Sequence, residues 1–128
     1  MAEPLDVHLV ATDREIWTGS ATLVSFSTLE GAIGIMPGHS PLLCMLRDGP
    51  ILIRQTEGDD LHAAVHLGFA VVDAGQVIIL AESAELAEEI DLQRARDLLE
   101  EARASEESES KEAALRRAET RIKVAETS

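Results

Sequence analysis

The stretch that decides the fold is Gly31-Ala32-Ile33-Gly34-Ile35-Met36-Pro37-Gly38-His39-Ser40-Pro41-Leu42. Three glycines and two prolines in twelve residues exclude a helix, because Gly loses backbone entropy there and Pro removes a hydrogen-bond donor. Ile33 and Ile35 alternate with small residues, which predicts a short strand with one packed face. Pro37-Gly38 predicts a turn. The residues alone therefore indicate a strand that leaves through a rigid loop.

Outward from this stretch, residues 5 to about 83 have the pattern of an all-β domain. Short segments rich in Val, Ile, Leu and Thr alternate with turn signals built from Gly, Pro and Asp. Helix-length segments between them are absent, which argues against a parallel α/β sheet. The spacing predicts a sandwich or barrel. Aromatic residues are scarce, at 2%, so the core is expected to consist of Val, Ile, Leu and Ala.

The composition changes near Ala81, and the rest of the chain predicts two helices. No Gly or Pro follows, and Ala, Glu, Arg and Leu dominate. Asp91 and Ser110 are the predicted N-caps. Two apolar stripes with spacings of three and four residues flank a polar break at 105–110, which predicts an antiparallel hairpin. The stripes are Leu92, Ala95, Leu99 and Ala102, then Leu115, Ala118, Ile122 and Ala125.

The predicted architecture is an all-β sandwich of about ten short strands at 1–86 and a helical hairpin at 87–128. Half of the stripe positions are Ala, and helices of this length are marginal without tertiary packing. The hairpin is therefore expected to dock on the sandwich or on another protein. If two docked states are close in energy, the hairpin is a switch, whereas a permanently docked hairpin explains the same pattern.

Charge and composition limit the possible partners. The formal net charge of −13 disfavours nucleic acid and anionic lipid, although eight of the eleven basic residues follow residue 85. No stretch approaches the ~20 apolar residues of a membrane span, and no secretory signal is evident. The sequence predicts a soluble cytoplasmic chain without direct membrane insertion. The single cysteine, Cys44, is expected to be a buried small hydrophobe.

No catalytic or metal-binding constellation is predicted. His62 and His66 would share a strand face but lie ~13 Å apart, too far to chelate one metal ion. His39 is expected to fix its loop or to contact a partner. Nucleophile elbows, Walker loops and dinucleotide-binding glycine motifs do not occur in the sequence.

The stretch 31–42 resembles the G-x-x-G-I-L-P-G-H-A-P-L signature of the epsilon subunit of F-type ATP synthases, with Met36 for Leu and Ser40 for Ala. The first hairpin, ending in Trp17-Thr18-Gly19, and the junction from 77 to 91 also match that family. One departure is His66-Leu67-Gly68-Phe69, where the family has Gly-Gly-Phe. Leu67 in this Gly position predicts a local change at that turn or strand start.

The resemblance implies a ten-stranded sandwich and a non-catalytic stalk subunit that needs no cofactor. Such a subunit contacts the gamma subunit and the c-ring, and it couples proton-driven rotation to ATP synthesis at the cytoplasmic face of the bacterial plasma membrane. Its hairpin can extend toward the catalytic beta and alpha subunits and inhibit ATP hydrolysis. The implied partner contacts are His39, Pro41, Arg116, Arg117, Arg121 and Lys123.

The run Ile90-Asp91-Leu92-Gln93-Arg94-Ala95 resembles the I/L-D-x-x-R-A segment with which some epsilon subunits bind ATP. From the residues alone it is an ion pair beside a helix start. The resemblance implies ATP as a regulatory ligand, although Glu101 stands where the family pattern has an arginine. The implied ATP contacts are Glu85, Ile90, Asp91, Arg94, Ala95, Arg117 and Arg121. The alternative function is a free-standing ATP-sensing protein without a stalk role.

Overall fold

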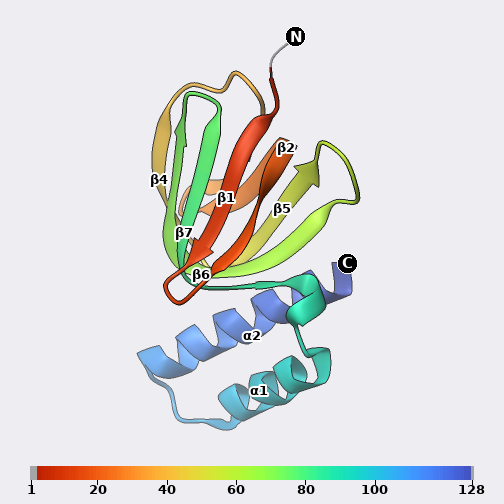
Figure 1. The fold of residues 1–128 in the computed structure, drawn as a ribbon. Coiled ribbons are helices and arrows are strands. Elements are labelled where there is room, and N and C mark those ends of the chain that lie inside the picture. Colours follow the sequence, from red (N-terminus) through yellow and green to blue (C-terminus); the bar gives the residue numbers. More distant parts are fainter. Residues whose placement is uncertain (1–2, 128) are drawn as a thin grey trace.

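The computed structural model describes residues 3–127, which form an all-β layer structure followed by two helices (Figure 1). The predicted fold class is confirmed. A short 3-10 helix, Ala87–Glu89, links the last strand to the helices α1 (Leu92–Ala104) and α2 (Glu109–Thr127). The strands are β1 (Leu5–Ala11), β2 (Glu15–Thr28), β3 (Gly31–Ile35), β4 (Leu42–Leu46), β5 (Gly49–Gln55), β6 (Leu61–Asp73) and β7 (Gln76–Leu86).

Backbone pairing closes the strands into a ring. β1 pairs with β7, β7 with β6, β6 with β5, β5 with β2, and β2 again with β1. The β1–β7 pair is parallel and the others are antiparallel. β3 extends the ring beside β2, and β4 extends it beside β6. The ring is flattened into two layers, with a mainly aliphatic core between them as the sequence predicts. Leu5, Val7, Ile53 and Ile79 are fully buried, together with the aromatic Phe26.

The structure has seven strands where about ten short ones are predicted. β2, β6 and β7 are long and pass from one layer to the other, so each contributes a segment to both layers. The observed and predicted strand counts therefore differ because the sequence suggests breaks inside strands that are continuous in the structure. Gly19 and Gly68 suggest breaks in the sequence, but both lie inside continuous strands. Gly49-Pro50, a pair of residues typical of a turn, forms the start of β5.

β6 changes layers at Leu67 and Gly68. The ladder between β6 and β7 omits Leu67, which has a φ of 52°, in the left-handed region that costs an L residue about 1–2 kcal/mol. Gly68 follows, and a Cβ at this position would lie 2.1 Å from the carbonyl oxygen of Leu80. The predicted local change at Leu67 is thus a strained residue in mid-strand, followed by a close backbone approach that only glycine permits.

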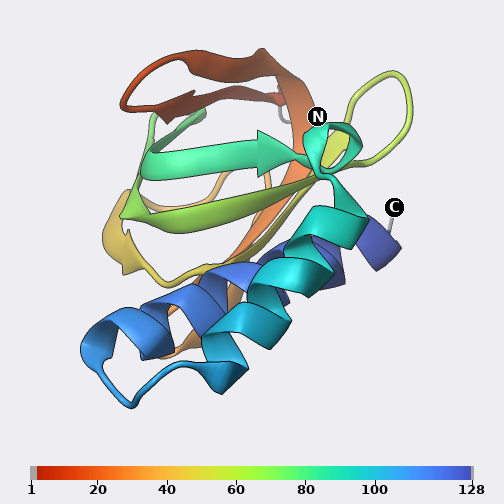
Figure 2. The ribbon, with the colours of Figure 1, turned by 90° about the horizontal axis from the view of Figure 1, so that it is seen from below.

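The helices form the predicted antiparallel hairpin. α2 lies across one end of the sandwich against β5 and β6, and α1 packs on the far side of α2 (Figures 1 and 2). The sequence leaves open whether the hairpin docks on the sandwich or on another protein. In this structure it docks on the sandwich. Ala95 and Ala102 of α1 and Ala118 of α2 are buried, so small stripe residues let the two helices approach closely.

The caps of the two helices differ in how well the sequence predicts them. Asp91 caps α1 as predicted: its Oδ1 accepts a hydrogen bond from the backbone N–H of Arg94, at 3.0 Å. This bond replaces the ion pair that the spacing suggests. The prediction for Ser110 is wrong, because the hydroxyl of Ser108 accepts from the N–H of Lys111, at 3.1 Å, and α2 begins at Glu109. The serines are two residues apart, and Ser108 lies at the end of the polar loop.

Candidate functional site

The outward face of one sheet layer is apolar across four strands. In the first row, Phe69 of β6 lies opposite Met45 of β4 and Leu80 of β7. These three side chains are 48%, 58% and 47% exposed. An antiparallel sheet that faces water normally alternates apolar and polar residues, so this face is built to be covered. We call it the apolar face. Its first row is Met45, Phe69, Leu80 and Val10, and its second row is Leu43, Val71 and Ile78, which ends at the polar His8 on β1.

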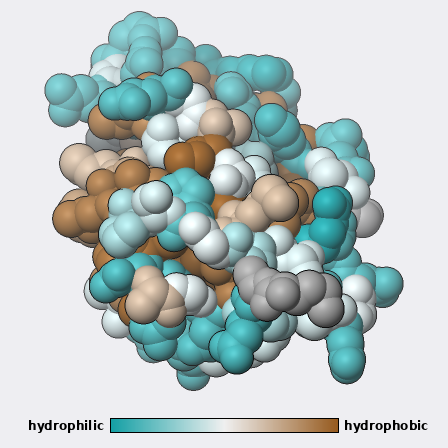
Figure 3. Space-filling model, turned by 90° about the horizontal axis from the view of Figure 1, so that it is seen from above, coloured by the Kyte–Doolittle hydropathy of each residue, from teal (hydrophilic) through white to brown (hydrophobic). Residues whose placement is uncertain are grey.

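A groove of about 510 Å³ lies at the end of the apolar face where β6 changes layers. Leu67 and Phe69 line it from β6, and Leu80 lines it from β7. Glu82 is the only charged residue among those that line it. Figure 3 shows apolar side chains gathered at the left of the view, on the side where β4 lies in Figure 1. The groove and the apolar face form one continuous surface suited to an apolar partner.

The loop between β3 and β4 directly precedes β4, one of the strands of the apolar face. It contains the predicted turn. The N–H of His39 donates to the carbonyl of Met36 at 3.1 Å, and Gly38 has a φ of 90°. Nδ1 of His39 lies 2.6 Å from the carbonyl oxygen of Ser40, so the ring fixes its own loop. Pro41 and Met36 are exposed beside it. The loop therefore presents a rigid, partly apolar tip.

α2 is fastened to the sandwich by a small charged cluster. Nε of Arg121 lies 2.5 Å from Oε1 of Glu85, at the end of β7. Nε2 of His66, which is 3% exposed, lies 3.8 Å from the same oxygen. His66 and Arg121 together lower the pKa of the Glu85 carboxyl to about 2. Arg121 lies within hydrogen-bond distance of Glu85, so this pair links α2 to the end of β7.

The pKa of Glu85 predicts how pH affects stability. Because the folded chain lowers this pKa from its ordinary 4.5 to about 2, the carboxylate stabilises the fold fully above pH 4.5 and loses its effect as the pH falls toward 2. Glu85→Gln should remove about 2 kcal/mol at pH 7 and much less at pH 2.5. Urea unfolding at the two pH values measures this difference. Glu57→Gln, in an exposed loop, is the control; equal losses at both pH values would contradict the assignment.

Two further ion pairs join the helical part to the sandwich. The guanidinium of Arg14 lies 2.9 Å from a carboxylate oxygen of Glu89, in the connection to α1, and it lowers the pKa of that carboxyl. Arg116 of α2 lies 4.0 Å from Oδ2 of Asp48, whose side chain is 4% exposed. These two contacts and the Arg121–Glu85 pair are polar links between the hairpin and the sandwich, and α2 also buries Val124.

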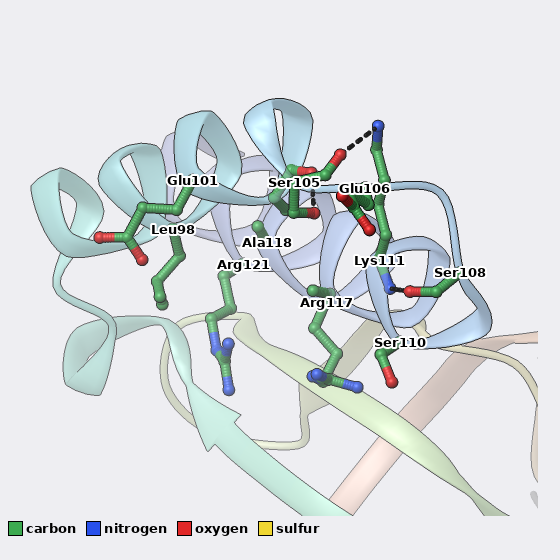
Figure 4. A pocket seen from close by; sticks show the side chains of 12 residues that line it. Leu98, Glu101, Ser105, Glu106, Ser108, Ser110, Lys111, Arg117, Ala118 and Arg121 are labelled. Carbon is green, nitrogen blue, oxygen red and sulfur yellow. Dashed lines mark hydrogen bonds between the residues drawn. The ribbon is translucent and has the colours of Figure 1, made fainter.

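A cavity of about 370 Å³ lies in the hairpin, lined by Arg117 and Arg121 of α2. Figure 4 shows these two side chains extending from α2 toward the strands, while Leu98 and Glu101 extend from α1. Glu101, the residue that replaces the arginine of the family pattern, lines the same cavity. A carboxylate beside two guanidinium groups weakens the attraction for phosphate.

The residues implied as ATP contacts are distributed over two places, the hairpin cavity with Glu85 beside it and the segment 90–95. Arg117 and Arg121 line the hairpin cavity, but Arg121 is already bonded to Glu85. The segment 90–95 lies at the other end of α1, where Asp91 serves as the cap. Its neighbour Arg96 lies 3.8 Å from Glu126, near the end of α2. In that segment Ala95 is buried, Ile90 is half-buried and Arg94 is exposed. In this docked state the implied contacts do not line one common pocket, and their role in ATP binding stays a prediction.

Other expectations concern metals and membranes. Within residues 3–127 no group of three or more His, Cys, Asp or Glu side chains is placed to hold a metal ion. No helix in this range is long and apolar enough to span a membrane. Cys44, expected to be buried, is half-buried in β4.

A small sandwich with a closed strand ring, an exposed apolar face and a docked helical hairpin has the features of a subunit of a larger assembly. Residues 4–87 match the family model described as the beta-sandwich domain of the ATP synthase delta/epsilon chain. The ATP synthase epsilon chain of Streptomyces avermitilis is 50% identical over 123 residues, which is 96% of each chain. The chain belongs to this ATP synthase delta/epsilon chain family, and it is a non-catalytic, epsilon-type subunit of the central stalk.

Further relatives and solved structures agree. The epsilon chain of Nocardia farcinica is 50% identical over 123 residues, covering 95% of this chain and 90% of that one. A chain in the OSCP/F1/c-ring structure of the Euglena gracilis mitochondrial ATP synthase superposes with a TM-score of 0.82 at 28% identity, covering 95% of this chain and 81% of that one. A Tetrahymena thermophila chain, at 17% identity and a TM-score of 0.65, shares the fold over 98% and 96% of the two chains.

Proposed function

We propose that the apolar face seats this subunit on the gamma subunit of the rotor. The observation that carries the proposal is the pair of apolar rows across β4, β6, β7 and β1, which leave large side chains exposed in the isolated chain. Burying such rows supplies about 25 cal/mol per Å² of apolar area removed from water. Through this contact the subunit turns with the rotor, which couples proton-driven rotation to ATP synthesis.

The loop tip between β3 and β4 is the second proposed contact, with the c-ring. His39 fixes this loop and Pro41 is exposed on it, so the tip is rigid before it binds. A rigid tip loses little conformational entropy on contact. With this contact, the subunit is expected to lie peripherally at the cytoplasmic face of the bacterial plasma membrane, held there by the c-ring.

The hairpin is proposed to regulate ATP hydrolysis in the catalytic head, formed by the alpha and beta subunits. Its attachment to the sandwich relies on polar pairs such as Arg121–Glu85 and on the weak 4.0 Å contact of Arg116. If the hairpin undocks, α2 presents Arg116, Arg117, Arg121 and Lys123 to acidic segments of the catalytic ring. A marginal docked state is the property that a switch requires.

Removing the residues after 88 tests this proposal. The sandwich keeps its core and its apolar face, so the shortened chain should assemble with gamma as the full chain does. Its complex should hydrolyse ATP faster than the complex with the full chain. Hydrolysis rates of the two purified complexes measure the effect. Unchanged hydrolysis would rule out an inhibitory hairpin, and lost assembly would show that the hairpin has a structural role instead.

ATP is proposed as a regulatory ligand of the hairpin. The support is the cavity with Arg117 and Arg121, whose volume falls in the range of ligand sites. Phosphate binding there would compete with Glu85 for Arg121. Calorimetric titration of the isolated chain with ATP should give saturable binding that Arg117→Ala, in the cavity, abolishes. No heat at millimolar ATP would leave a hairpin that responds to rotation and partner contacts alone.

A further inference from the structure

Leu67 combines a strained backbone with an exposed apolar side chain. Among residues 3–127 only Leu67 and Ala74 are non-glycine residues with a positive φ. Ala74 lies in the tight turn between β6 and β7, beside Gly75 with a φ of 80°, and such turns require this conformation. Leu67 lies inside a strand, where glycine would have the same conformation without strain. The large side chain therefore needs a separate explanation.

The strained conformation is held from within the sandwich. The N–H of Leu67 donates to Oδ1 of Asp48 at 3.0 Å. The Asp48 side chain is itself 4% exposed, so this acceptor is well fixed. The fold thus presents Leu67 in one fixed position. The fold does not bury the side chain of Leu67, which is 53% exposed.

The side chain of Leu67 lies in the groove at the end of the apolar face. Phe69 and Leu80 of the first apolar row line the same groove. The groove is therefore continuous with the surface assigned above to gamma. Its one charged lining residue, Glu82, forms no ion pair with any residue from 3 to 127. Apart from Glu82 the lining is uncharged, so the matching partner surface is mainly apolar.

We infer that Leu67 is a specificity-determining anchor of the gamma contact, a residue whose backbone strain is offset only when its side chain is buried by the partner. The inference rests on the proposed seating of the subunit on gamma. Backbone strain that has no counterpart in the chain's own packing is typical of binding sites, where the partner completes the environment. A backbone that is held in place before binding also loses little conformational freedom on binding.

The test compares two glycine variants of the full chain. Leu67→Gly and Ala74→Gly each relieve a left-handed residue, but only the first removes a side chain from the groove. Leu67→Gly should leave the urea unfolding midpoint unchanged or raised and should weaken binding to gamma about tenfold or more. Ala74→Gly should have the same effect on the midpoint and bind gamma like the unaltered chain. Leu67→Ala, which keeps the strain, should weaken binding without raising the midpoint.

Each other outcome overturns the inference. Wild-type affinity of Leu67→Gly would mean that Leu67 is no anchor. A lowered unfolding midpoint of Leu67→Gly would mean that the chain's own packing already offsets the strain. Phe69→Asp, in the centre of the apolar face, separates this inference from the proposal beneath it. If Phe69→Asp loses binding while Leu67→Gly keeps it, only the inference fails; if the unaltered chain does not bind gamma, both fail.

Discussion

Gly68→Ala is expected to lower the free energy of unfolding by about 3 kcal/mol. A Cβ at this position would lie 2.1 Å from the carbonyl oxygen of Leu80 and 2.8 Å from Cα of Ala81. Both atoms belong to the backbone of β7, so no side-chain rotation relieves the overlap. β7 must move away from β6, which opens the ring where both strands change layers.

Urea unfolding of the variant measures the effect, and Gly34→Ala provides the matched control. Gly34 also lies in a strand, β3, but a Cβ there would lie 3.4 Å from the flexible end of Leu23, an ordinary contact. The control should stay within about 0.5 kcal/mol of the unaltered chain. Equal free energies of unfolding for Gly68→Ala and Gly34→Ala would show that β7 can move away from β6 without loss of stability.

Phe69→Asp is expected to weaken the affinity for gamma more than a hundredfold, or about 3 kcal/mol. Phe69 stands in the middle of the first apolar row, between Met45 and Leu80. A partner that covers this row would have to bury the new carboxylate without a counter-charge, because no basic residue lines the adjoining groove. The fold itself should persist, since the side chain is 48% exposed.

The measurement is calorimetric titration of gamma with the variant, together with thermal unfolding to verify the fold. Leu29→Asp is the matched control, because Leu29 is 69% exposed on the turn between β2 and β3 and lies outside the apolar face. It should bind gamma normally. Wild-type affinity of Phe69→Asp would place the gamma contact on another surface.

The sequence predicts the local structure of this protein better than its long-range contacts. Alternation over Ile33 and Ile35 and the capping residue Asp91 depend on near neighbours, and both predictions are confirmed. Strand length is harder to predict. Gly19 and Gly68 suggest strand ends, whereas in the structure small residues let long strands bend or approach each other closely.

The candidate surface has a signal in the sequence, but its geometry comes only from strand pairing. The segments Leu42–Leu46 and 77–80 are apolar at every position, a pattern of strands covered on both faces. Nothing in the sequence gives the register that aligns Met45 with Phe69. Likewise, Glu85 and Arg121 are each predicted as ATP contacts, but in the structure they form an ion pair with each other. The two residues are 36 positions apart, so local spacing does not predict this pair.

The strand ring also determines how the chain reaches this structure. β1 pairs with β7, and residues such as Leu9 and Ile79, which are 70 positions apart, are direct neighbours. Bringing such distant segments together has a high entropic cost before any contact forms, so sheets of this topology fold in milliseconds to seconds rather than microseconds. The ring closes only when the first strand meets the last. Until then the unpaired edges of β1 and β7 can pair with other chains, so the slow closure is also the step most exposed to aggregation.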